Sequence, residues 1–145
     1  MTEPARTRRP LTAGERLVCI GAAVILASML LPWYGIRFSG LSSSGFDSFG
    51  FGAVALLVTA GAAVVIVIRE AAGRPPTRPL RSAELVIVAG LWAAAIGVYL
   101  VFDRPDELAG STEISPQLGI FVAIGGAAAI VVAGMRMRSE RVPTT

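Results

Sequence analysis

Four long apolar stretches dominate the sequence. They contain no Asp, Glu, Lys, Arg or His, and they cover residues 17–34, 49–68, 85–102 and 116–135. A helix needs about 20 mainly apolar residues to cross a bilayer, and one charged residue at its centre costs about 2.5 to 3.5 kcal/mol. The pattern therefore predicts an all-α membrane protein, built as a four-helix transmembrane bundle.

The polar segments between these stretches complete the predicted layout. We expect one domain over residues 1–145, with outer connections at 35–48 and 103–115 and a cytoplasmic connection at 69–83. The four expected helices cover about 14–34, 49–68, 84–102 and 116–135.

The arginines indicate which side of the membrane is cytoplasmic. There is no lysine, and every arginine except Arg37 and Arg104 lies in a tail or in connection 69–83. Lys and Arg in short loops stay on the cytoplasmic side, so both termini are predicted to be cytoplasmic. The arginines would then lie against an anionic inner leaflet, at about 1 kcal/mol each. They sit beside helix ends and form no separate basic domain, so no nucleic-acid partner is expected.

The beginning of the first helix has a recognisable cap. Thr12 followed by Glu15 is a capping-box pattern, which predicts a helix start at the cytoplasmic interface. The apolar stretch is longer than the core of a typical signal peptide, and no small-x-small cleavage site precedes Pro32. We therefore expect an uncleaved helix in a multi-pass membrane protein. Arginine without lysine, with abundant Ala, Gly, Val and Pro, is commonest in GC-rich bacterial genomes, so the expected location is the bacterial inner (plasma) membrane.

Aromatic residues mark the far end of the same helix. Pro32 discourages helical geometry at Leu31, while Trp33 and Tyr34 are amphipathic rings of the kind that settle at headgroup level. An aromatic belt is favoured here over a recognition site. The other members of the expected belt are Phe49, Phe51, Tyr99, Phe102 and Phe121.

The outer connection 35–48 is rich in glycine and serine but also carries spaced phenylalanines. It is predicted to fold back on the membrane surface or to form two short extended pieces that turn at Ser44 and Gly45. A pure linker has no need of the phenylalanines, so this connection is the candidate partner-binding site. Its expected residues are Trp33, Tyr34, Phe38, Phe46, Asp47 and Phe49.

Small residues at four-residue spacing predict close helix packing. The three expected ridges are Ala55, Thr59 and Ala63; Ala89, Ala93 and Gly97; and Gly125, Ala129 and Ala133. Such faces serve either the bundle itself or a homo-oligomer. Trp92 falls near the middle of its helix, where filling a gap in the bundle is favoured over lining a ligand cleft.

The sequence offers no residue set for catalysis, a cofactor or a metal. It has no His, and its one cysteine, Cys19, cannot form an internal disulfide. Asp103, Asp106 and Glu107 lack the glycine-pinned spacing of a calcium loop, which favours a solvated acidic loop. An embedded enzyme is therefore the least favoured class.

Three short motifs carry a resemblance to a known group. Leu31-Pro32-Trp33, then Phe46-Asp47 after a Ser/Gly-rich loop, then Gln117-Leu118-Gly119 resemble small, uncharacterised four-helix membrane proteins of actinobacteria. The resemblance implies the four-helix layout but no activity. Claudin-like tetraspan proteins have a similar layout, yet the paired outer-loop cysteines on which they depend are absent here.

Two function classes remain. The first is a structural or interaction (accessory) component of the cell envelope that presents its outer loop to a protein partner. The second is a subunit of a passive pore or small-solute transporter, which would need polar groups facing a lumen. Ser28, Thr59 and Gln117 are scattered over different helices and depths, so the first class is preferred.

Overall fold

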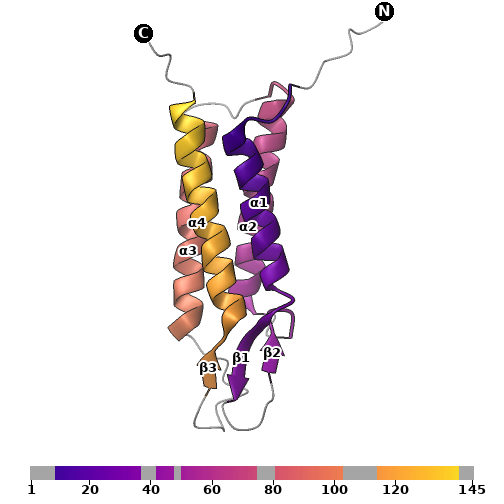
Figure 1. The fold of residues 1–145 in the computed structure, drawn as a ribbon, viewed down its shortest axis with the longest axis vertical. Helices are drawn as coiled ribbons and strands as arrows, with labels where there is room; N and C mark the ends of the chain where they lie inside the picture. Colours follow the sequence, from indigo (N-terminus) through magenta and orange to yellow (C-terminus); the bar gives the residue numbers. More distant parts are fainter. Residues whose placement is uncertain (1–8, 37–41, 48–49, 75–80, 103–113, 141–145) are drawn as a thin grey trace, which may run out of the picture.

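A computed structural model describes residues 9–36, 42–47, 50–74, 81–102 and 114–140 (Figure 1). In chain order the elements are α1 (Ala13–Ser28), β1 (Pro32–Ile36), β2 (Ser42–Ser44), α2 (Phe51–Ala71), α3 (Ser82–Phe102), β3 (Ile114–Pro116) and α4 (Leu118–Ser139). The helices run alternately up and down. The three strands lie at one end of the bundle, here called the strand end, while the start of α1 and the end of α4 lie at the other, here called the terminal end.

Among the described residues, three helices are long and apolar enough to cross a membrane. These are α2, α3 and α4, with 21, 21 and 22 residues. The first helix is shorter than expected, because Ala13–Ser28 has 16 residues and spans only about 24 Å. The chain turns after Met29 and becomes extended at Pro32, so the expectation of a helix over 14–34 is wrong in its last turns.

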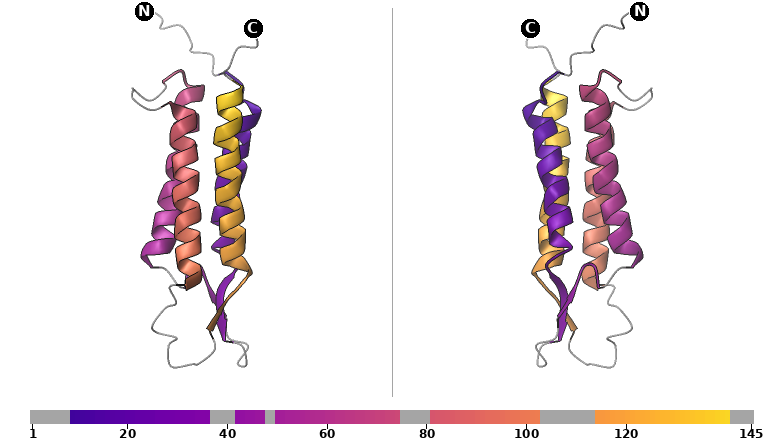
Figure 2. Two further views of the ribbon diagram at one scale, coloured as in Figure 1. Left: turned by 90° about the vertical axis from the view of Figure 1, so that its left-hand side faces the viewer. Right: turned by 90° about the vertical axis from the view of Figure 1, so that its right-hand side faces the viewer.

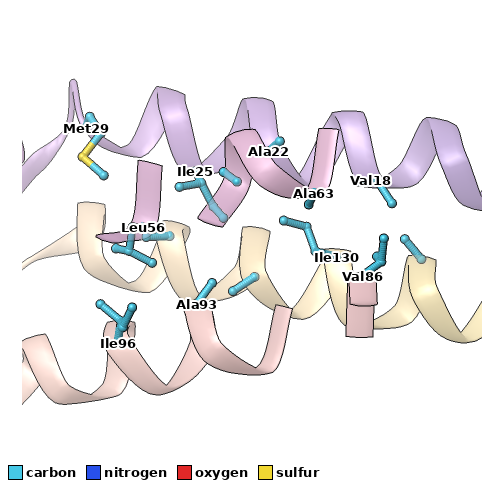
Figure 3. Packing of buried hydrophobic residues seen from close by; sticks show 14 of the residues in the cluster. Val18, Ala22, Ile25, Met29, Leu56, Ala63, Val86, Ala93, Ile96 and Ile130 are labelled. Carbon is cyan, nitrogen blue, oxygen red and sulfur yellow. The ribbon is translucent and has the colours of Figure 1, made fainter. Parts of the chain in front are cut away.

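Buried positions recur at alternating spacings of three and four along every helix. In α2 they are Ala53, Leu56, Ala60, Ala63 and Val67. This spacing keeps the apolar stripe facing neighbouring helices that are nearly parallel or antiparallel. Figure 3 shows side chains from all four helices meeting along the bundle axis, among them Ile25, Leu56, Val86 and Ile130.

Glycines bring α4 close to two neighbours. A Cβ on Gly21 of α1 would lie 2.8 Å from the carbonyl oxygen of Gly126, and one on Gly126 would lie 2.9 Å from that of Gly21. On another side of α4, a Cβ on Gly134 would lie 3.0 Å from the Ala83 carbonyl oxygen of α3. These contacts need bare backbone, as in other tight membrane helix pairs.

The predicted ridges are displaced on all three helices. On α2 the two nearest buried positions before Ala63 are Leu56 and Ala60, while Ala55 and Thr59 are half-buried. Gly90, not Ala89, is the buried partner of Ala93 and Gly97, and Gly126 is buried while Gly125 has nothing within 4 Å. Four-residue steps drift by about 40° per step around a helix, so a ridge read only at that spacing leaves the packed face.

Trp92 is a further correction. Its side chain is 58% exposed, so it does not fill a gap in the bundle. It belongs to the outer surface of α3, together with Val88 and Tyr99.

The sheet joins the two connections at the strand end. Its order is β2-β1-β3, and both pairings are antiparallel. Gly35 of β1 pairs with Ser42 on one side and Ser115 on the other. A turn is present at residues 45–47, but the paired strands β1 and β2 both precede it and α2 follows it, so the expectation of two extended pieces that turn at Ser44 and Gly45 is wrong. The third strand was not predicted.

Candidate functional sites

Trp33 and Tyr34 are buried where the sheet meets the bundle. Their exposed fractions are 1% and 2%. The Trp33 indole Nε1 donates a hydrogen bond to the Ser28 carbonyl oxygen at 2.7 Å, and the Tyr34 hydroxyl donates one to the Leu100 carbonyl oxygen at 2.7 Å. Trp33 and Tyr34 were expected either in an aromatic belt or on an exposed partner-binding loop. Both rings are instead buried, so neither expectation holds for these two residues.

Two glycines make room for the Trp33 ring. A Cβ on Gly45 would lie 2.7 Å from Trp33 Cε2, and a Cβ on Gly119 would overlap the ring and lie 2.8 Å from the Pro32 carbonyl oxygen. The Gln117 backbone N–H also donates to the Trp33 carbonyl oxygen at 2.8 Å. Segments far apart in the sequence thus meet around one tryptophan.

The turn after β2 is held by an aspartate. The Asp47 carboxylate accepts hydrogen bonds from the Ser44 hydroxyl at 2.8 Å and from the Ser44 backbone N–H at 3.1 Å. Both hydrogen bonds stabilise the charged carboxylate and hold the Asp47 pKa below its usual value, and the bond from the Ser44 hydroxyl has the larger effect. Phe46, at the tip of this turn, is 45% exposed.

Of the six predicted site residues, the structure brings four into one region. Trp33 and Tyr34 form its buried base, while Phe46 and Asp47 lie on its exposed turn. Phe38 and Phe49 lie outside the described residues.

Exposed aromatic residues surround the strand end. Phe51 begins α2, Phe102 ends α3, and Tyr99 and Phe121 lie close to the same level. Their exposed fractions range from 54% to 84%. This part of the expected belt faces outward, in contrast to Trp33 and Tyr34.

A second polar region lies at the terminal end, and most of it was not predicted. The capping box of Thr12 and Glu15 is confirmed, but Glu15 is also 1% exposed and is joined to Arg9 by two hydrogen bonds, of 2.5 and 3.2 Å. Arg9 reaches Glu70 of α2 as well, at 3.6 Å. No local pattern in the sequence links residues 9 and 70.

The same end contains a cavity of about 240 Å³. Glu140, which follows α4, accepts a hydrogen bond there from the Gly14 backbone N–H at 3.2 Å. The cavity is lined by Arg9, Thr12, Glu15, Met137 and Glu140. Its carboxylates are therefore engaged with groups of the chain itself.

The bundle interior is apolar through the part of the chain that the structure describes. Its buried polar residues there are Glu15, Ser28 and Ser82, and the Ser28 hydroxyl donates to the Ile25 carbonyl oxygen. No group of three or more His, Cys, Asp or Glu suited to a metal occurs among the described residues. One copy of this bundle thus offers no polar lumen along its described axis.

Comparisons with protein families, curated proteins and solved structures find no match to this chain.

Proposed function

We propose that this chain is a four-pass protein of the bacterial plasma membrane that acts as a structural or interaction component of the cell envelope. In this proposal α1 is the fourth span, the strand end faces outward, and the turn at Phe46 and Asp47 is the surface offered to a protein partner. Three features of the described residues support it.

The first feature is the charge at the terminal end. Arginines there are exposed, and they include Arg16, Arg69, Arg74, Arg81, Arg136 and Arg138. The nearby carboxylates are turned to internal partners, because Glu15 binds Arg9, Glu140 accepts from Gly14, and Glu84 accepts from the Arg81 backbone N–H at 3.1 Å. This leaves a net basic surface for anionic headgroups.

The second feature is the two-sided character of α1. Val18 and Ile25 are fully buried in the bundle, while Ile20 and Leu26 are more than half exposed. A helix that is apolar on both faces fits a lipid environment better than water. Local thinning of the bilayer and snorkelling by Arg16 would accommodate its short length.

The third feature is the exposed turn, and this observation carries the functional part of the proposal. Trp33 packs β1 against α1 and α4, and its ring also contacts Gly45, so the turn between β2 and α2 adjoins a closely packed region. A fixed aromatic side chain beside a charged one is a typical interface anchor with a steering group. The packed interior supports an interaction role rather than conduction.

The test compares two exposed phenylalanines. The tagged full chain is recovered from its own membranes in mild detergent, and co-purifying proteins are measured at equal membrane abundance for wild type, for Phe46→Ala with Asp47→Ala, and for Phe51→Ala. An aromatic anchor carries about 2 kcal/mol or more, which is over tenfold in affinity, so the double variant should lose the partner.

Phe51→Ala is the matched control, because Phe51 is exposed at the same end but is expected to face lipid. It should leave recovery unchanged. Equal recovery from the wild type and the double variant, or equal loss in both variants, would reject the turn as the docking surface.

A further inference from the structure

The four helices are not held together equally. The two glycines of α1, Gly14 and Gly21, lie against α4, where added Cβ atoms would meet Met137 and Gly126. The two glycines of α2 behave differently: Gly52 lies against Leu100 of α3, and Gly61 has nothing within 4 Å. No glycine therefore brings α1 and α2 into close backbone contact. Figure 2 accordingly shows α1 grouped with α4, and α2 grouped with α3.

The contact surface between α1 and α2 is here called the α1–α2 seam. A charged side chain crosses this seam at the terminal end. The Arg9 guanidinium binds Glu15 of α1 through both Nη atoms and lies 3.6 Å from the carboxylate of Glu70 on α2. Glu15 and Glu70 side chains are only 1% and 11% exposed. A planar guanidinium can serve two carboxylates at once, which a lysine ammonium does less well.

The segment that carries Arg9 is also anchored by contacts that do not involve Arg9 itself. Leu11 packs against the hydrophobic core, and Thr12 caps α1 by accepting a hydrogen bond from the Glu15 backbone N–H at 3.3 Å. The Thr12 backbone N–H donates in return to the Glu15 carboxylate at 2.9 Å. The position of Arg9 over the seam is thus set by the chain on its C-terminal side.

We infer that the Arg9 guanidinium, by contacting Glu15 and Glu70, holds α1 and α2 together at the terminal end. This interaction is here called the latch, and the bundle opens along the α1–α2 seam when it is lost. Loss of Arg9 would remove the one cation that contacts both Glu15 of α1 and Glu70 of α2 in the described residues, and with it the charged contact that joins the two helices at this end. The α1–α4 and α3–α4 contacts would persist, because they rest on backbone packing. Release would also uncover the cavity at this end, since Arg9 is one of its lining residues.

The chain contains its own reporter for this motion. Cys19 follows Glu15 by one helical turn, which places it on the same side of α1. It is half-buried and packs against the core. A rise in its rate of alkylation above the wild-type rate therefore reports opening of the seam.

The experiment measures N-ethylmaleimide labelling of Cys19 in the full chain in mild detergent. Arg9→Gln should raise the rate about tenfold, because the Arg9 side chain, although 42% exposed, is the cation that contacts two carboxylates that are themselves nearly buried. Arg16→Gln is the matched control, because Arg16 is exposed at the same end, and it should leave the rate unchanged. A wild-type rate in Arg9→Gln would overturn the latch.

A second reporter separates seam opening from general loosening. Ala94 is half-buried on α3, one turn after Gly90 on the side that faces α4. In the Cys19→Ser, Ala94→Cys background, Arg9→Gln should not change the labelling rate. An equal rise at positions 19 and 94 would overturn the inference, because it would show global destabilisation.

A milder variant serves if Arg9→Gln does not accumulate. Arg9→Lys keeps the charge but loses the fork that reaches both carboxylates, so labelling at position 19 should rise severalfold while labelling at position 94 stays constant. A wild-type rate at position 19 in this variant would equally reject the latch.

Discussion

At the residue scale, Trp33 organises the strand end. Its ring lies between Gly45 of the turn and Gly119 of α4, and its indole N–H is bonded to the last residue of α1. Tryptophan supplies a large apolar surface with one donor, and the glycines supply the space. The Pro-Trp, Gly-Phe-Asp and Gln-Leu-Gly motifs are thus parts of one packing arrangement.

Gly119→Ala tests this arrangement. A Cβ there would collide with the Trp33 ring and lie 2.8 Å from the Pro32 carbonyl oxygen, so we expect the free energy of unfolding to fall by about 1 to 3 kcal/mol. Thermal unfolding in detergent gives the measurement. Gly125→Ala in the same helix is the control, because Gly125 has nothing within 4 Å and alanine favours helix by about 0.5 to 1 kcal/mol. Equal melting temperatures for the two variants would count against the packing role of Trp33.

At the scale of elements, the presence of the helices could be predicted from the sequence, whereas the residues at which they end and the elements that they contact were harder to predict. The absence of charge over about 20 residues marks α2, α3 and α4 whatever their neighbours. The end of α1 and the strand at Pro32 depend on pairing with Ser42–Ser44 and Ile114–Pro116. Those partners are distant in the sequence, and short strands carry little periodicity of their own.

The candidate partner-binding site could likewise be predicted only where its structure depends on neighbouring residues in the sequence. The turn at residues 45–47 could be predicted, because glycine and serine mark turns locally. The burial of Trp33 could not, because an amphipathic aromatic after a helix stop suits both a membrane interface and a packed junction. The Arg9–Glu70 pair was missed since it joins distant segments.

Gly97→Leu tests the packing of α3 on α4. A Cβ at this position would lie 2.7 Å from Ile124 Cγ1, so the larger side chain should force the helices apart and lower the free energy of unfolding by about 1 to 3 kcal/mol. Gly61→Leu offers a matched change on an open face of α2. An unaltered melting profile for Gly97→Leu, or the same loss for Gly61→Leu, would place this face of α3 against lipid.

At the scale of the whole molecule, the two ends of the bundle differ in character. The strand end combines a three-stranded sheet, an exposed turn and outward-facing aromatic residues, whereas the terminal end combines exposed arginines with two nearly buried carboxylates, Glu15 and Glu70. This polarity is what an oriented membrane protein requires, with basic residues on the cytoplasmic side and an aromatic belt at the outer interface. The central proposal is that the chain crosses the membrane four times, with the strand end outside.

Cysteine labelling in intact cells tests this claim most directly. In a Cys19→Ser background, Ser42→Cys reports the strand end and Ala72→Cys reports the terminal end, both at exposed positions. A membrane-impermeant maleimide should label Ser42→Cys in intact cells and should label Ala72→Cys only after the membrane is opened. Labelling of Ala72→Cys in intact cells, with Ser42→Cys protected, would contradict the orientation; labelling of both would contradict the four-pass arrangement.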